Sequence, residues 1–345
     1  SLLEGSLLAS ELIEEKIQTI VFGRTRRSIE LILTYIRQRS SGDNPNRIRG
    51  YRSGYLSKER RAIEEGLRRG EVQGVVATSA LELGIDIGGM DASVLIGYPG
   101  SIAGTRQQAG RAGRKLAPSL SILVTSANAM DQYLARHPEY FFDRSPERAL
   151  IAPNNLLILL QPIRCAAFEL PFQPNEGFGA ISVERLRAFL ELLFQSGQLH
   201  QQGERFFWMA DQYPAAEISL RNATPDQVTL MVNGSYRQET IGQVDLASAY
   251  WMVHPEAVYL HEGTSYLVDS LDLEAGAAYL RETAIDYYTQ AREETQVEQK
   301  TLQKQAPVEG ATKSLGEIIV STKVVGYRKI RWFTHEFLGG GEVNL

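Results

Sequence analysis

Two arginines stand three residues apart in the segment QQAGRAGR, residues 107–114, among glycine and alanine. Small neighbours leave the guanidinium groups of Arg111 and Arg114 unshielded and let a ligand come close to the backbone. The planar guanidinium group pairs with carboxylate or phosphate oxygens, often two at a time. The segment therefore predicts a binding site for a polyanion.

Charge is unevenly divided along the chain. The net charge is −5, but residues 1–150 hold 21 Lys or Arg and 17 Asp or Glu, a net charge of +4. Residues 151–345 hold 15 basic and 24 acidic residues, a net charge of −9, whereas residues 24–69 alone reach +8. A strongly basic face indicates a polyanionic partner such as nucleic acid. A solvated, arginine-rich surface without a ligand is the alternative.

Composition narrows the class of protein. A hydrophobic content of 43% with 22% charged residues is that of a globular protein, and 345 residues suggest two or three domains. Apolar runs stay shorter than a membrane span, and the N-terminal segment is acidic where a signal peptide is basic. We therefore expect a cytoplasmic protein with no membrane partner. Because the chain begins with Ser rather than Met, we also expect it to be part of a longer protein.

Metal ligands are sparse in the sequence. The sole cysteine, Cys165, excludes a disulfide framework and a cysteine-based zinc site within the chain. The histidines do not have a spacing typical of metal ligands; they are His137, His200, His254, His261 and His335. We therefore predict no metal site, and no zinc, in this chain.

The first 130 residues alternate between strand-like and helical patterns. Continuous apolar runs, typical of buried parallel strands, occur at 17–23, 72–79, 92–99 and 119–126. Apolar residues recur at helical spacing in 24–40 and 57–71. The alternation predicts an α/β domain over residues 1–130 with a parallel sheet. Ligands bind beyond the carboxyl ends of the strands in such sheets, and this is where the 107–114 segment falls.

The rest of the chain predicts a connector and two further parts. Residues 131–153 are rich in aromatic residues and proline, and residues 154–213 have the order helix, helix and hairpin of a winged helix. A small helical spacer without a ligand would have the same order. Strand patterns dominate residues 214–345, so we expect a β-rich, barrel-like module there. Its polar segment near 293–314 predicts a mobile loop.

Three segments have the order and spacing of a known motif set. They are IVFGRTRRSIE (20–30), VVATSALELGIDIGGMD (75–91) and QQAGRAGR (107–114). Together they resemble the late motifs of superfamily 2 helicases of the DEAD/DEAH type, which implies that the first 130 residues are a second RecA-like motor domain. The segments HPEYFFDRSPERALIAPNN, GQVDLASAYWMVHPEAVYLHEGTSYLVDSLD and VVGYRKIRWFTHEFLGGGEV resemble the narrower MrfA/YprA-like branch of DNA-repair helicases. This resemblance implies an ATP-dependent DNA helicase that moves from 3′ to 5′.

The resemblance assigns a role to the arginine pair. It implies that Arg114 is the arginine finger that contacts the γ-phosphate of ATP, with Arg111 beside it and Gln107 at the start of the motif. A finger of this kind stabilises transition-state charge and is worth about 10³–10⁵ in rate. The resemblance also places Gly84 and Asp86 near ATP, although Asp86 could instead cap the turn after a strand.

The two earlier motifs contact a nucleic-acid backbone in this family. The resemblance implies such contacts for Arg24, Thr25, Thr78 and Ser79, and the basic stretch adds Arg52 to the set. For Thr78 the alternative is a cap at the end of a strand. Spacing alone does not rank Arg24 above the arginines that follow it.

A second basic set lies near the C-terminus. In the segment KVVGYRKIRWFTHE, aromatic residues are interleaved with Lys323, Arg328 and Lys329. Basic and aromatic side chains together suit single-stranded nucleic acid, through phosphate neutralisation and base stacking. Alternation along a strand would equally send the aromatic side chains into a core.

Half of the expected ATP site is missing from the sequence. Helicase motors hold phosphates with G-x-x-x-x-G-K-[ST] and Mg²⁺ with an acidic pair, whereas this chain contains neither a Gly-Lys nor an Asp-Glu dipeptide. We therefore expect ATP and Mg²⁺ to bind mainly to a first RecA-like domain that this chain lacks. The chain alone is not expected to hydrolyse ATP. Its expected partners are that domain and DNA, as a single strand or a tailed duplex.

Two other interpretations stay open. Residues 20–114 do not distinguish an RNA helicase from a DNA helicase, and only the later segments favour DNA. The other alternative is a nucleic-acid-binding protein with a degenerate motor domain. The intact arginine pair argues against degeneration.

Overall fold

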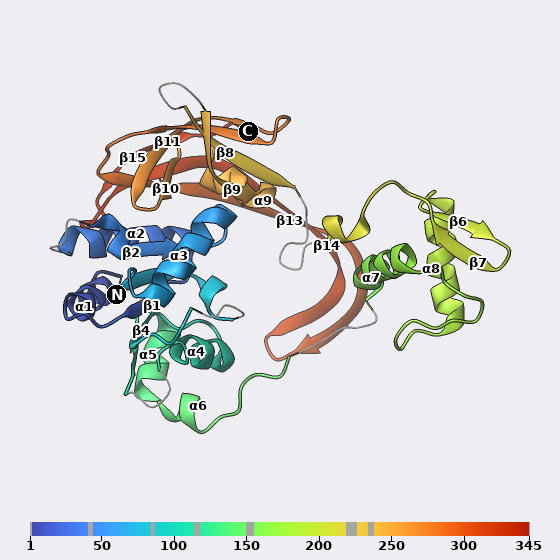
Figure 1. Ribbon diagram of the computed structural model, residues 1–345, viewed down its shortest axis with the longest axis horizontal. Coiled ribbons are helices and arrows are strands. Elements are labelled where there is room, and N and C mark those ends of the chain that lie inside the picture. The colour runs from blue at the N-terminus through green and yellow to red at the C-terminus, as the bar shows by residue number, and fades with distance from the viewer. Residues whose placement is uncertain are drawn as a thin grey trace. The chain divides into compact units, whose positions relative to one another are not determined.

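The computed structural model describes residues 2–40, 44–83, 87–113, 118–149, 155–218, 226–233 and 238–344. They form two compact units, shown in Figure 1. The larger unit combines Ser1–Glu147 with Gln227–Leu345, and the smaller unit is Arg148–Asp226. The α/β domain and the β-rich module predicted from the sequence therefore share one unit.

A five-stranded parallel sheet forms the centre of the α/β domain. Its strand order is β2 (Ile48–Tyr51), β3 (Gly74–Ala77), β1 (Thr19–Phe22), β4 (Ala92–Ile96) and β5 (Leu120–Val124). Strands β1, β3 and β4 are buried throughout, which explains their unbroken apolar runs. The predicted α/β class is confirmed. Strand β2, with the sequence IRGY, was missed because it is short and contains a charged residue.

Helices cover both faces of this sheet. On one face, α1 (Leu2–Glu14) and α2 (Arg26–Arg39) bury their apolar residues against β1, β3 and β4. On the other face, α3 (Ser57–Arg69) contributes Ile63 and Leu67 to a second core cluster. The short helices η1 (Pro45–Arg47), η2 (Ser79–Leu81), α4 (Ile102–Ala109), α5 (Ala129–Arg136) and α6 (Glu139–Phe142) lie in the connections.

The β-rich module consists of two sheets. The first has the order β10 (Val258–His261), β11 (Thr264–Asp272), β12 (Ala277–Glu282), β8 (Gln227–Asn233) and β9 (Gln238–Asp245), and α9 (Leu246–Met252) packs against it. The second contains β13 (Tyr287–Val308), β14 (Ala311–Arg331) and β15 (Phe337–Glu342). Among the described residues both sheets are open, so the expected barrel is a pair of sheets.

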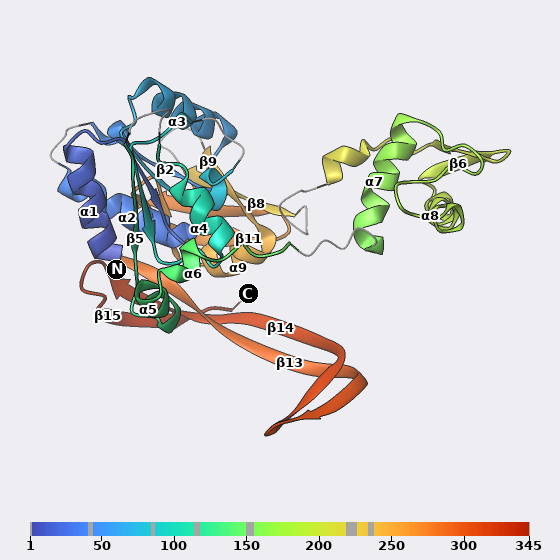
Figure 2. The same cartoon turned by 90° about the horizontal axis from the view of Figure 1, so that it is seen from below.

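The predicted mobile loop near 293–314 is wrong, because these residues belong to β13 and β14. Figure 2 shows the two strands as a long ribbon that extends from the module. Pairing across the ribbon places Val297 opposite Val320, and Gly310, with a φ of 72°, lies in the turn. The outgoing strand is polar because the ribbon is exposed on both faces. Its residues pair across a hairpin, from Glu293 with Val324 to Val308 with Ala311, and their polar composition did not reveal this pairing. We call residues 293–322 the arm.

The smaller unit has the winged-helix order that the sequence predicts. Helices α7 (Leu156–Glu169) and α8 (Val183–Gln195) are followed by the hairpin of β6 (Leu199–Gln202) and β7 (Arg205–Trp208), and then by η3 (Pro214–Glu217). Ser182 caps α8 by accepting a hydrogen bond from the Arg185 amide. The core of the unit lies between the helices and the hairpin; it includes Ile163, Leu186, Leu190, Leu199 and Phe206.

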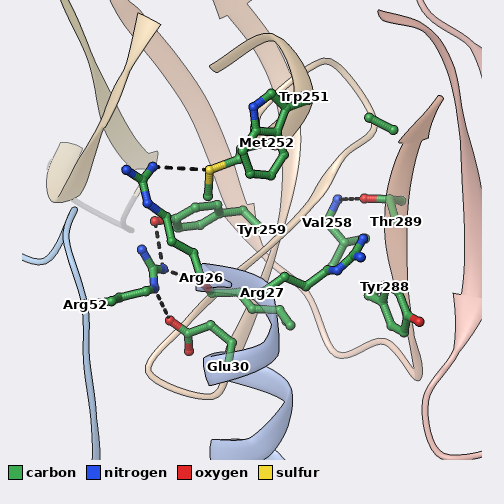
Figure 3. A pocket seen from close by; sticks show the side chains of 12 residues that line it. Arg26, Arg27, Glu30, Arg52, Trp251, Met252, Val258, Tyr259, Tyr288 and Thr289 are labelled. Carbon is green, nitrogen blue, oxygen red and sulfur yellow. Dashed lines mark hydrogen bonds and ion pairs between the residues drawn. The ribbon is translucent and has the colours of Figure 1, made fainter. Parts of the chain in front are cut away.

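A buried ion pair within the α/β domain also contacts the β-rich module. The side chains of Arg52 and Glu30 are 1% and 2% exposed, with Arg52 Nε 2.7 Å from Glu30 Oε1. Arg52 Nη2 donates to the Tyr259 hydroxyl and to the Leu260 carbonyl, both at 3.0 Å, on the β-rich module. Figure 3 shows Arg52, Glu30 and Tyr259 among the residues that line a cavity of about 60 Å³. The Tyr55 hydroxyl also donates to Glu30 Oε1, and burial and the Glu30 charge raise the pKa of Tyr55 well above its usual value.

Further ion pairs join the same two parts of the unit. Glu262 of the module accepts hydrogen bonds from Arg37 and Arg49 at 2.9 and 3.0 Å and from the Gly50 amide at 3.1 Å. Arg26 pairs with Asp245 at 3.1 Å. Each contact joins α2 or β2 to the module, so charged side chains fix how the two parts dock.

Loss of Arg52 should destabilise the larger unit strongly. Arg52→Ala leaves the Glu30 carboxylate buried without its partner, and we expect a loss of about 3–5 kcal/mol in the free energy of unfolding. Arg281→Ala removes an exposed arginine paired with Asp269 and should cost less than about 1 kcal/mol. Urea denaturation compares the two variants. Equal losses would contradict the account, and Glu30→Leu combined with Arg52→Met should recover part of the stability.

His254 should make stability depend on pH. It is fully buried, stacks on Tyr327 of β14 at 5.4 Å, and donates from Nδ1 to the Pro255 carbonyl at 2.8 Å. Burial lowers the pKa of His254 below 6.5, although the hydrogen bond to Pro255 acts in the opposite direction. The unfolded chain therefore binds this proton more tightly, so the contribution is complete above about pH 6.5 and is lost as the pH falls.

His254→Phe tests this linkage because it keeps an aromatic ring in the stack. The wild-type chain should lose up to about 1.4 kcal/mol of unfolding free energy per pH unit below pH 6.5 that the variant does not lose. Urea denaturation between pH 7.5 and 5.5 gives both slopes. Parallel slopes would show that His254 is not the linked group.

Candidate nucleotide and nucleic-acid sites at the sheet edge

The loops after β1 and β3 lie side by side at the carboxyl edge of the parallel sheet. The two strands are neighbours, with Phe22 paired to Ala77, and the Gly23 amide donates to the Ala77 carbonyl at 3.0 Å. The structure thus brings together four residues predicted to contact nucleic acid; they are Arg24, Thr25, Thr78 and Ser79. Edges of this kind bind ligands in α/β folds.

Two of these residues also have local structural roles. Thr25 caps α2: its hydroxyl accepts from the Ser28 amide at 3.0 Å, and the Ser28 hydroxyl accepts from the Thr25 amide at 2.9 Å. The Thr78 hydroxyl accepts from the Ala80 amide at 3.4 Å and caps η2. Both caps fix the loop conformation at the sheet edge.

Arg24 and Ser79 are exposed at this edge. The aliphatic part of Arg24 lies against Gly97, which follows β4 and has a φ of 83°. A Cβ atom at Gly97 would approach Arg24 Cδ to 3.2 Å. The glycine therefore provides both the backbone conformation and the space that the arginine side chain uses.

Arg111 is bound to the middle motif. Its Nε and Nη2 donate to the Glu82 carbonyl at 3.1 and 2.7 Å, and Gln108 Nε2 donates to Glu82 Oε2 at 2.9 Å. Glu82 therefore connects two of the three segments that the sequence singled out. Sequence reasoning missed both Glu82 and the buried Gln108, and the only available signal was their position within the motifs. Gln107 is half-buried on α4.

Three residues predicted to contact ATP lie outside the described part of the chain. They are Gly84, Asp86 and Arg114. The described neighbours on either side of them are Leu83, Ile87 and Gly113, and the Gly113 amide donates to the Met90 carbonyl at 2.8 Å. The ends of the two motif segments are therefore held close to each other.

Helix α4, which carries Gln107, is held at both ends. Ser101 caps it by accepting from the Gly104 amide at 2.9 Å, and Glu147 accepts from the amides of Ile102 and Ala103 at 2.6 and 3.1 Å. The hydrogen bonds from Ile102 and Ala103 lower the pKa of the Glu147 carboxyl. At the other end, the Ser121 hydroxyl donates to the Ala109 carbonyl at 3.0 Å. Because Ser101 and Glu147 already occupy these amides, the first turn of α4 does not offer them to a phosphate. A phosphate near α4 would therefore contact side chains.

Arg52 does not lie at this surface. Its side chain is 1% exposed, and its donors bind Glu30, Tyr259 and Leu260. The predicted phosphate contact of Arg52 is therefore wrong, because the guanidinium group holds the β-rich module in place. The composition of a basic stretch does not reveal which of its arginines is buried.

The predicted basic set near the C-terminus is divided between two faces of β14. Arg328 and Lys329 are adjacent on the strand, so their side chains point to opposite faces. Lys329 Nζ lies over the rings of Tyr287 and Tyr327 at 5.3 and 5.9 Å, whereas Arg328 is exposed. Lys323 is exposed at the base of the arm, opposite Glu294.

The nearby aromatic residues Trp332 and Phe333 differ in burial. Trp332 packs against the core cluster of Tyr35, whereas Phe333 lies 4.7 Å from the Tyr35 ring in a tilted arrangement and is 44% exposed. The alternative that the aromatic side chains form a core thus holds for Trp332.

Neither a metal-binding cluster nor a membrane-spanning helix occurs in the part of the chain that the structure describes. No group of three or more His, Cys, Asp or Glu side chains that could hold a metal occurs in the described ranges. Within the same ranges, every helix is too short or too polar to cross a membrane.

Comparison with known proteins agrees with this architecture. Residues 5–115 match the helicase conserved C-terminal domain, and residues 151–223 match the winged helix domain of the ATP-dependent helicase HRQ1. The fold and the sheet-edge motifs thus define the second motor domain of a superfamily 2 helicase.

The similar proteins define the branch. The ATP-dependent helicase YprA of Bacillus subtilis is 44% identical over 99% of this chain, and hrq1 of Schizosaccharomyces pombe is 29% identical over 95%. The crystal structure of helicase MrfA bound to DNA has a TM-score of 0.83 and 43% identity over 99% of this chain. A second MrfA structure, bound to DNA and AMPPNP, has a TM-score of 0.82 and 44% identity. The chain belongs to the MrfA/YprA branch of superfamily 2 helicases. It spans 46% of YprA and 31% of hrq1.

Arg111 should hold the middle motif through its two hydrogen bonds to Glu82. Arg111→Lys keeps the charge but cannot reproduce the paired guanidinium donors, so we expect faster amide hydrogen exchange in residues 79–83. Arg106→Lys is the control, because Arg106 Nη2 donates instead to the carbonyls of Phe141 and Arg144. Unchanged exchange at 79–83 in the Arg111 variant would contradict this role.

Proposed function

We propose that this chain is the part of an ATP-dependent DNA helicase that contains the second motor domain, and that the helicase acts in DNA repair. The observation that carries the proposal is the junction at the sheet edge. There Arg111 of the last motif donates two hydrogen bonds to the Glu82 carbonyl of the middle motif. The Arg24 and Thr78 loops follow two neighbouring strands of the same sheet. The DNA-bound state of the MrfA structures supports DNA over RNA.

The ATP site is divided between two domains in this proposal. Arg114 is the arginine finger, Arg111 orients the segment that carries it, and Gln107, Gly84 and Asp86 line the nucleotide. A first RecA-like domain, which this chain lacks, holds the phosphates and Mg²⁺. Charge that develops on the transferred phosphoryl group meets the finger only when the two domains close. The chain alone does not hydrolyse ATP.

A single strand of DNA runs along the sheet edge in this proposal. Arg24 neutralises a phosphate, and the hydroxyls and amides of Thr25, Thr78 and Ser79 contact the neighbouring backbone. Both threonine caps preorganise these loops, so little ordering is needed on binding. Closing and opening of the motor domains then move the strand, from 3′ to 5′, on a tailed duplex.

Several finer assignments stay proposals from the sequence. They are the part boundaries at residues 130, 153 and 213, and the cytoplasmic location. The smaller unit, Arg148–Asp226, has its own core, so the winged helix can be produced and tested by itself.

Removal of the arginine finger should abolish turnover without removing nucleotide binding. In a protein that contains both motor domains, Arg114→Ala should lower the kcat of DNA-stimulated ATP hydrolysis by about 10³–10⁵. The KM for ATP should change far less, because the finger acts mainly in the transition state. Arg106→Ala removes an arginine of the same helix region and should leave kcat within a few-fold. A kcat that survives in Arg114→Ala would refute the assignment.

A further inference from the structure

A groove lies at the base of the arm, on the sheet of β13, β14 and β15. It has a volume of about 690 Å³ and is lined by Arg292, Arg328, His335 and Phe337, with Glu342 at one side. The strand register explains why two arginines share it. Arg292 is paired with Gly326, and Arg328 with Gln290, so both side chains project from the same face of the ribbon.

The two arginines of this groove have no carboxylate partner among the described residues. Among the described residues neither Arg292 nor Arg328 forms an ion pair, and both are exposed. Glu342 is the one carboxylate of the lining. The exposed Arg281 of the module is by contrast paired with Asp269 at 2.8 Å. The groove therefore has a net positive charge and room for an anion.

Glycines and one exposed ring shape the floor and rim of the groove. Gly340 of β15 lies opposite Arg328, and a Cβ atom there would meet the Tyr327 carbonyl oxygen at 2.2 Å. Without side chains at Gly340 and Gly341, a ligand can approach the backbone closely. Phe337 is 63% exposed at the same surface. An exposed aromatic ring beside unpaired arginines provides both components that single strands need, stacking and phosphate contact.

Side-chain contacts connect this groove to the edge of the motor domain. The guanidinium group of Arg27, in the first turn of α2 and three residues after Arg24, lies over the Tyr288 ring at 5.4 Å. The Tyr288 hydroxyl is 3.4 Å from His335 Nδ1, and His335 lines the groove. Arg27 is therefore linked to the groove through the buried Tyr288 side chain.

We propose that the groove binds single-stranded nucleic acid as a continuation of the motor's strand-binding edge. Arg292 and Arg328 contact phosphates, and Phe337 stacks on a base. This inference rests on the proposed function and refines it. The two arginines are assigned to the groove because they lie on one face of the ribbon and are exposed. Of the basic set predicted near the C-terminus it retains Arg328, whereas Lys329 is engaged with tyrosine rings on the other face.

Salt-dependent binding tests the arginines. Fluorescence anisotropy measures binding of labelled oligothymidylate to the 345-residue chain at several salt concentrations. In the double variant Arg292→Ala with Arg328→Ala, the slope of log binding constant against log salt concentration should be smaller by about 1.4, at about 0.7 per lost phosphate contact. The matched control is Arg68→Ala with Arg69→Ala, which removes the same charge from α3 and should leave the slope unchanged. Phe337→Ala should weaken binding about fivefold or more without changing the slope, because stacking releases no counterions.

The outcomes separate this inference from the proposed function. If Arg24→Ala weakens binding and the groove variants bind like the wild type, the groove inference is wrong and the motor-edge site stands. If neither Arg24→Ala nor the groove variants matter, both nucleic-acid assignments fail. The inference would also be overturned if the groove variants lost duplex binding but kept single-strand binding. It would likewise be overturned if the wild-type chain did not bind the oligonucleotide.

Discussion

The larger unit depends on one buried ion pair, that of Arg52 and Glu30. Two charges with side chains 1% and 2% exposed are stable only together, and the remaining donors of Arg52 are satisfied by Tyr259 and Leu260 of the β-rich module. The α/β domain therefore has a complete set of hydrogen bonds at this point only when the module is docked. The ion pairs of Glu262 with Arg37 and Arg49, and of Asp245 with Arg26, further fix the orientation of the module on the α/β domain.

This docking has a functional consequence because Glu30 and Arg52 lie next to the sheet edge. Glu30 lies on α2, whose first residues follow Arg24 and Thr25, and Arg52 directly follows β2. The module therefore supports the start of the helix that presents the proposed strand contacts. In a motor whose two domains open and close, the module and its arm would move with the second domain as one unit, since charged contacts on α2 and β2 hold it.

The predictability of each feature follows its physical origin. The parallel sheet could be predicted because full burial on both faces leaves an unbroken apolar run in β1, β3 and β4. The arm could not, because its residues are largely polar and exposed, and only their pairing across the hairpin makes them strands. Arg52 resembled its neighbours in sequence, and only the fold shows that it is buried. Glu82 gave no signal apart from its place in a motif, since its carbonyl makes the decisive contact with Arg111.

The central claim is that the ATP site is divided, with the arginines on this chain and the phosphate cradle on another domain. The most direct test is ATP hydrolysis, with saturating single-stranded DNA, by the chain alone and by the chain joined to a first RecA-like domain. The account predicts turnover at the buffer background for the chain alone and DNA-stimulated turnover for the joined protein. DNA-stimulated hydrolysis by the chain alone would contradict it.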